Sequence, residues 1–177
     1  QEQQKAFFES NATVRLVRGG NRSGKSICTF MEFARVARGL DPFNKFPKNR
    51  PLLMYVIGRD ADYIGRVAYR LLFKPGAIKI ILDEKTGHWR SYRPWAEDKE
   101  RSHEAVDAPP FIPPECIDPK GWAFENKAER VFSVCRLNFG EGHPMNGTEI
   151  RAFGSRSEPA MGDPVDVVLI DEDIDNE

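Results

Sequence analysis

Eight residues near the start of the chain constrain its fold more than any other feature. Residues 19–26, Gly-Gly-Asn-Arg-Ser-Gly-Lys-Ser, fit the pattern G-x-x-x-x-G-K-[S/T] of a phosphate-binding loop. Glycine at both ends lets successive backbone N–H groups turn inward around an anion. The pattern predicts a nucleotide site in which Lys25 reaches the β- and γ-phosphates and the Ser26 hydroxyl binds Mg²⁺. The expected nucleotide-binding residues are Gly19, Gly20, Asn21, Arg22, Ser23, Gly24, Lys25 and Ser26.

A phosphate-binding loop joins a strand to a helix, and the flanking residues fit that context. Val14, Leu16 and Val17 favour a short strand before the loop. After it, apolar residues recur at helical spacing from about residue 24 to 37, and Gly39 is placed to end that helix. The alternative for residues 19–26 is a glycine-rich turn that binds no ligand.

The rest of the chain alternates between strand and helix patterns. The apolar run 52–57 is typical of a buried parallel strand, and residues from about 60 to 73 predict a helix capped by Asp60 or Asp62. A brief apolar run at 79–82 follows. Residues 131–137 and 149–153 predict an antiparallel hairpin with a long loop. These patterns predict an α/β fold with a mostly parallel sheet flanked by helices.

Composition sets outer limits on the class of protein. The 177 residues suffice for one domain, and the net charge of −1 does not mark a nucleic-acid binder. Three scattered cysteines suggest neither a metal site nor a disulfide framework, so a reducing compartment is expected. No apolar run approaches membrane-spanning length. Because the chain starts at Gln1, we expect it to be part of a longer protein.

Regular patterning breaks down between about residues 83 and 121, a segment rich in proline and tryptophan. A long irregular segment of this kind is usually functional or an insertion. Trp89, Trp95, Arg90 and Arg93 could form a contact surface. The favoured interpretation is a loop that its tryptophans hold against the core.

A second part of the nucleotide site is expected near residue 170. The run Asp-Val-Val-Leu-Ile-Asp-Glu at 166–172 predicts a buried strand that ends in two carboxylates. Ligands of open α/β sheets bind at the carboxyl ends of strands. Asp171 is therefore expected to hold Mg²⁺ as a Walker B aspartate, and Glu172 to activate the attacking water. An Asp-Glu pair beside a phosphate-binding loop indicates hydrolysis of ATP.

These motifs resemble the ATPase domain of the large terminase subunit of tailed bacteriophages. The resemblance rests on residues 19–26, on Glu-Pro-Ala-Met-Gly at 158–162, on residues 166–172, and on the tryptophan-rich segment 83–114. It implies a motor that uses Mg-ATP hydrolysis to drive double-stranded DNA into a preformed capsid. It also implies a homo-oligomeric ring, a portal protein and a small terminase subunit as partners. The expected location is the cytoplasm of an infected bacterium, with transient docking on the procapsid.

The resemblance implies further residue roles and two omissions. An upstream glutamine contacts adenine in the family, and Gln4 is the matching residue. The usual arginine position in the loop holds Asn21, so Arg22, Arg156 or a neighbouring subunit could supply the catalytic arginine. The coupling motif after Walker B and the nuclease domain are not expected within residues 1–177. In related ATPases the strand after Walker B lies between the Walker A and Walker B strands.

Three other functions remain open from the sequence. A helicase or recombination motor would share the same nucleotide motifs. A nucleotide or metabolite kinase would want an acceptor pocket and an arginine-rich lid, and no clear lid stands out. A non-catalytic nucleotide-binding module is disfavoured by the intact Lys25, Ser26, Asp171 and Glu172.

Overall fold

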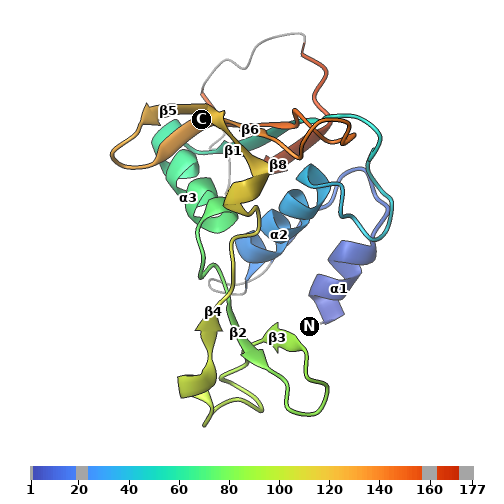
Figure 1. Cartoon of the computed structure of the whole chain (residues 1–177), viewed down its shortest axis with the longest axis vertical. Coiled ribbons are helices and arrows are strands. Elements are labelled where there is room, and N and C mark those ends of the chain that lie inside the picture. Colours follow the sequence, from blue (N-terminus) through green and yellow to red (C-terminus); the bar gives the residue numbers. More distant parts are fainter. Residues whose placement is uncertain (1, 19–23, 157–162, 172–177) are drawn as a thin grey trace.

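A five-stranded sheet in the order β5–β6–β7–β1–β8 organises the structure (Figure 1), a computed structural model that describes residues 2–18, 24–156 and 163–171. The strands are β1 Leu53–Gly58, β5 Ile117–Asn126, β6 Val131–Leu137, β7 Glu149–Gly154 and β8 Val167–Ile170. Strand β1 pairs in parallel with both β7 and β8, whereas β5–β6 and β6–β7 are antiparallel. The described chain is thus a mixed α/β fold, with the predicted hairpin formed by β6 and β7.

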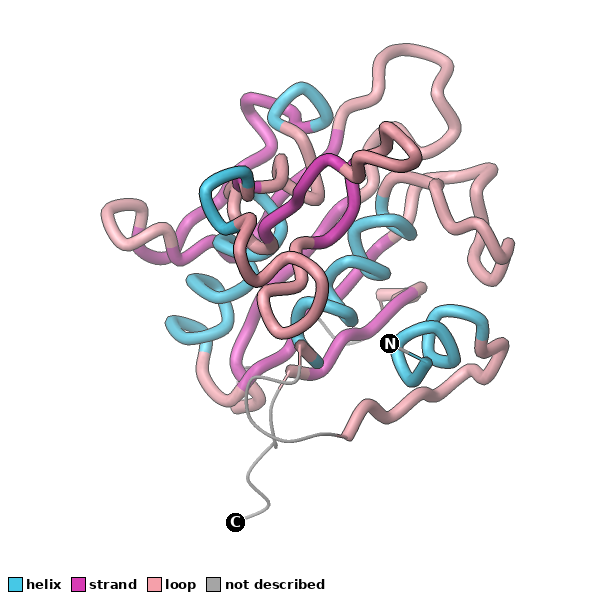
Figure 2. The backbone as a smooth tube through the Cα atoms, turned by 90° about the horizontal axis from the view of Figure 1, so that it is seen from below, coloured by secondary structure: helices cyan, strands magenta, loops and turns pink. Residues whose placement is uncertain are grey.

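Two helices, α2 Lys25–Ala37 and α3 Ala61–Phe73, cover one face of this sheet. The predicted stop of α2 is confirmed: Gly39 has φ 68°, and the Leu40 N–H donates to the Arg35 carbonyl at 2.8 Å. Asp60 caps α3 by accepting a hydrogen bond from the Tyr63 N–H at 2.7 Å. A shorter helix, α1 Glu2–Glu9, lies at the opposite end of the molecule from the β5–β6 hairpin (Figures 1 and 2).

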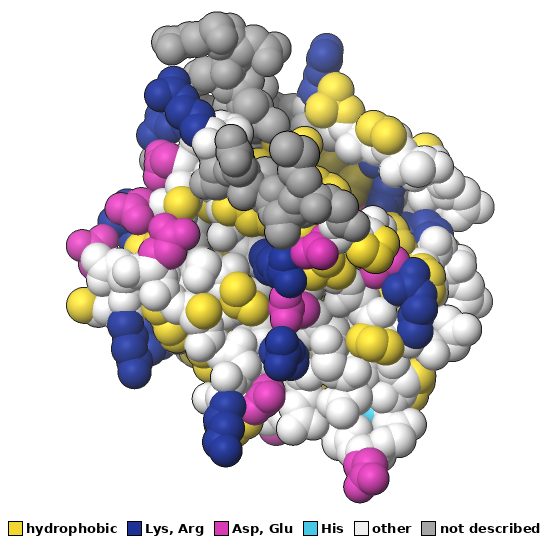
Figure 3. All heavy atoms as spheres, turned by 90° about the horizontal axis from the view of Figure 1, so that it is seen from above, with side chains coloured by type: hydrophobic (Ala, Val, Ile, Leu, Met, Phe, Trp, Pro, Cys, Tyr) yellow, Lys and Arg dark blue, Asp and Glu magenta, His cyan; other side chains and the backbone are white. Residues whose placement is uncertain are grey.

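The core lies between the helices and the sheet. Met54 and Val56 point toward the helices and are fully buried, and their parallel neighbours on β7 and β8 share that face. The sheet's other face holds Tyr55 against Phe153, and it is crossed by a line of charged side chains (Figure 3). Glu149 on that face accepts hydrogen bonds from Arg136 and Arg151.

Strand β8 is present but is not buried as predicted. Leu169 is buried in the core and Val167 packs partly buried against it, while Val168 and Ile170 on the opposite face are 50% and 56% exposed. The prediction of a buried strand is wrong because the described helices cover only one face of the sheet, and the other face of β8 has no cover among the described residues.

The expected strand at residues 14–17 is absent, which corrects a second prediction. Val14 and Leu16 are 86% and 75% exposed, and this segment has no strand partner among the described residues. Arg15 anchors the segment instead, donating to Glu32 Oε1 at 2.6 Å and to the Phe7 carbonyl at 3.2 Å. Val14, Leu16 and Val17 favour an extended backbone, but a strand forms only where a neighbouring strand is available for hydrogen bonding.

The tryptophan-rich segment forms a separate small sheet, not a loop held against the core. Its strands are β2 Lys79–Leu82, β3 Trp89–Ser91 and β4 Val106–Asp107, in the order β3–β2–β4. It projects below the main sheet (Figure 1), and Trp89 and Trp95 are 57% and 74% exposed. Its centre is ionic: Arg90 donates to Asp83 at 2.8 Å and to both oxygens of the buried Asp98.

None of the described helices is long and apolar enough to cross a membrane.

Candidate nucleotide site

The structure brings together two residues that the sequence assigned to Mg²⁺. Ser26 lies in the first turn of α2, and Asp171 directly follows β8. The Ser26 hydroxyl donates to Asp171 Oδ1 at 2.8 Å, although the residues are 145 positions apart. Asp171 is only 9% exposed, and Ser26 is partly buried. A hydroxyl oxygen and a carboxylate oxygen this close together could both serve as ligands of one metal ion.

Both ends of β8 are held in register with β1, and this fixes the position of Asp171. At the start of β8, Asp166 accepts from the Leu53 N–H at 2.9 Å and pairs with Arg50, whose hydrogen bonds lower the pKa of the Asp166 carboxyl. At the other end, the Asp171 N–H donates to the Ile57 carbonyl at 3.0 Å. The carboxylate therefore stands at the carboxyl end of a parallel strand, as predicted.

The start of α2 provides backbone donors beside this pair. Gly24 has φ 80° and offers no side-chain cap, and the N–H groups of the first turn of a helix are the donors that anions bind. Gln4 approaches the same point from α1: a Cβ at position 24 would lie 3.4 Å from Gln4 Nε2. Glycine at this position suits the left-handed backbone, and the Gln4 amide lies within van der Waals contact distance of it.

Two arginines follow the carboxyl ends of the parallel strands, at the same side of the sheet as Asp171. Arg156 follows β7 by two residues, and its neighbour Ser155 donates a backbone hydrogen bond to the Gly58 carbonyl at 2.8 Å. Arg59 follows β1 directly, and its side chain is 60% exposed. Arg59 was not singled out in the sequence. The available signal was its place immediately after a buried strand, next to the strand that carries Asp171.

Several predicted site residues lie outside the described residues. These are Gly19, Gly20, Asn21, Arg22, Ser23 and Glu172. The described part of the site therefore consists of Gln4, Gly24, Lys25, Ser26 and Asp171. Within the described ranges, no three His, Cys, Asp or Glu side chains gather into a metal-binding group. Magnesium sites in nucleotide-binding proteins commonly use one or two carboxylates, with substrate phosphates and water as further ligands, so the Ser26–Asp171 pair fits this ion.

No protein-family model matches the chain, and the comparisons with curated proteins and with solved structures found no significant match.

Proposed function

We propose that this chain is a P-loop ATPase domain that binds and hydrolyses Mg-ATP at the start of α2. The observation that carries the proposal is the 2.8 Å hydrogen bond between the Ser26 hydroxyl and Asp171 Oδ1. A phosphate-binding loop and an acidic strand end are separately common in sequences. Their meeting across 145 residues is what a Mg-nucleotide site requires.

Each residue has a role that follows from its position. Lys25 and the N–H groups at the start of α2 bind the β- and γ-phosphates. Ser26 and Asp171 would hold Mg²⁺, which would supply positive charge to neutralise the charge that develops on the phosphates. Glu172, the residue after Asp171, is assigned to orient and deprotonate the attacking water. Gln4 is assigned to the adenine, and Arg22 or Arg156 to the transition-state charge.

Within P-loop ATPases, we propose the packaging motor of a tailed bacteriophage, the large terminase subunit. Support comes from the strand arrangement as well as the motifs. In the described residues, β8 pairs with β1 on one side only, and Val14 and Leu16 lie exposed without a strand partner. The edge of β8 opposite β1 fits the place where related ATPases insert the strand after Walker B. Double-stranded DNA, a portal protein, a small terminase subunit and a ring of identical subunits in the host cytoplasm belong to this proposal.

The test of the ATPase proposal is a titration of the purified protein with a fluorescent ATP analogue in Mg²⁺. Lys25→Ala removes the cation assigned to the phosphates, and we expect binding to fall by a factor of ten or more, because hydrogen bonds to charged groups contribute about 1.5–3 kcal/mol. Lys99→Ala, at an exposed lysine of the small sheet, is the matched control. Equal affinity of Lys25→Ala and the control would refute the nucleotide site.

A further inference from the structure

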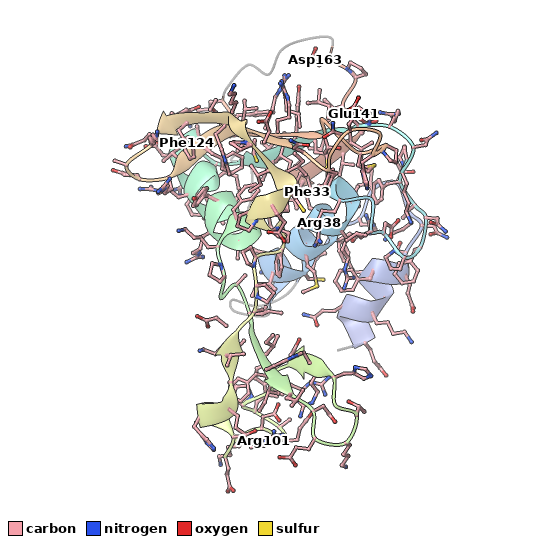
Figure 4. All side chains as sticks on the ribbon, viewed as in Figure 1. Phe33, Arg38, Arg101, Phe124, Glu141 and Asp163 are labelled. Atoms are coloured by element: carbon pink, nitrogen blue, oxygen red, sulfur yellow. The ribbon has the colours of Figure 1, made fainter. Side chains whose placement is uncertain are left out.

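A hollow of about 330 Å³ lies at the edge of the main sheet farthest from β8. It is formed by α3, strand β5 and the turn between β5 and β6. Its lining contains three aromatic and three basic side chains: Tyr69, Trp122, Phe124, Lys120, Lys127 and Arg130. Figure 4 shows Phe124 on β5 above α3, at the end of the molecule away from α1.

The aromatic side chains form a preformed platform. Trp122 and Phe124 are stacked, with ring centroids 5.2 Å apart and an interplanar angle of 21°. Tyr69 adds a third ring 5.7 Å from Trp122. Beneath them, the buried Phe73 and Phe132 hold Trp122 by edge contacts at 4.9 and 5.9 Å. Because the core fixes these rings, little side-chain freedom is lost when a planar ligand stacks on them.

The charged side chains that line the hollow are all basic. Lys120, Lys127 and Arg130 are all exposed, and no carboxylate belongs to the lining. The nearby Glu129 is occupied by Arg66 at 2.8 Å. This local concentration of positive charge stands out in a chain whose net charge is −1.

We propose that this aromatic–basic hollow binds single-stranded nucleic acid, with one base on the rings and its phosphates on the cations. Aromatic faces bind bases with little sequence preference, and basic side chains follow the backbone. A duplex keeps its base faces stacked inside, so it could use the cations but not the rings. An acidic peptide would likewise leave the rings without a planar partner.

The site is independent of the ATPase proposal. Strand β5 and strand β8 are the two opposite edges of the sheet, so the hollow is separated from Ser26 and Asp171 by three strands. Binding measured without nucleotide and without Mg²⁺ therefore reports on the hollow alone. A failed ATPase test would leave this inference standing, and the reverse also holds.

The test uses the tryptophan of the platform as its own reporter. The chain has three tryptophans, and Trp89 and Trp95 are exposed on the small sheet. In the full chain carrying Trp89→Phe and Trp95→Phe, titration with a short oligodeoxythymidine should quench Trp122 fluorescence. A duplex of the same length should bind at least about tenfold more weakly, because it cannot stack on the rings.

Two variants test the two halves of the hollow. Phe124→Leu keeps apolar bulk but removes a stacking face, and should weaken binding about tenfold. Lys127→Glu with Arg130→Glu should lower the salt dependence of binding by about two thirds, because two of three phosphate contacts are lost. Lys85→Glu with Lys99→Glu, at exposed lysines of the small sheet, is the control of equal charge and should bind as the parent does.

The expected pattern is quenching of Trp122, preference for the single strand, and loss of binding in the hollow variants but not in the control. Each variant is first compared with the parent by circular dichroism and thermal melting, so that only folded protein is scored. The inference is overturned by absent binding, by preference for the duplex, or by equal effects of the hollow and control variants.

Discussion

The contact between Ser26 and Asp171 predicts that the two residues act on nucleotide binding as one unit. Consider Ser26→Ala, Asp171→Asn and the double variant, each titrated with a fluorescent ATP analogue in Mg²⁺ and again in a chelator. Both oxygens are assigned to one ion, so either single change should remove most of the metal-dependent affinity. The second change should then add little.

The structure sets the size of this effect. The two side chains touch at 2.8 Å in a site where Asp171 is 9% exposed. Contacting residues of one network show interaction energies of about 0.5–3 kcal/mol. We expect a coupling of about 1.4 kcal/mol or more in Mg²⁺, which corresponds to a tenfold departure from additivity. In chelator, only the direct hydrogen bond remains to couple the two positions.

Thr29→Ala is the matched control for Ser26→Ala. Thr29 lies one turn further along α2, and its hydroxyl donates to the carbonyls of Lys25 and Ser26 at 3.3 and 3.1 Å. Its removal should leave nucleotide affinity unchanged. If Ser26→Ala and Asp171→Asn are additive within about 0.5 kcal/mol in Mg²⁺, the two residues do not share an ion and the reasoning is refuted.

Three further predictions concern other parts of the chain. Glu172→Gln should retain Mg-ATP but stop phosphate release, because the assigned base is lost while the metal ligands remain; parent-rate release would exclude Glu172 as the base. Asp60→Ala should lower the free energy of unfolding by about 1 kcal/mol in a urea titration, whereas Asp60→Asn, an equally good cap, should not; equal losses would show that the cap bond is unimportant. Hydrogen bonds from Arg90 lower the pKa of Asp83 and Asp98 to about 2 in the folded small sheet, against about 3.9 in an unfolded chain. Their stabilisation is present above that unfolded value and is lost as pH falls through about 2, so Trp89 and Trp95 fluorescence should change in that interval, and Asp98→Asn should shift the change to higher pH.

The elements that the sequence predicted well are those whose signals are local. The helices after Gly24 and Asp60 follow from apolar spacing, a cap and a stop, all contained in one stretch of chain. Strand β1 was also found, because a run of apolar residues between turn signals needs no knowledge of its neighbours. For the site, two separate motifs assign Ser26 and Asp171 to Mg²⁺; the structure places the two side chains in contact, and their role in metal binding stays a prediction.

The errors arose where structure depends on distant partners. Residues 14–17 have strand propensity but no strand partner among the described residues, and Val168 is exposed although its run reads as buried. Strand β5 was missed because Pro119 and Gly121 break its pattern. It tolerates both as an edge strand with an irregular register. The small sheet escaped prediction because its strands are short and the ionic contacts of Arg90 with Asp83 and Asp98 leave no apolar period in the sequence.

The separation of Ser26 from Asp171 also has a kinetic consequence. Closing a flexible loop of 145 residues costs about 4 kcal/mol of chain entropy, before any contact within the loop offsets it. Ser26 and helix α2 are synthesised long before β8, so a nascent chain carries half of the proposed metal site without its carboxylate. Contacts of high sequence separation tend to form late in folding. Metal-dependent nucleotide binding should accordingly appear as one of the last events of folding, and its rate of appearance would report the docking of β8 beside β1.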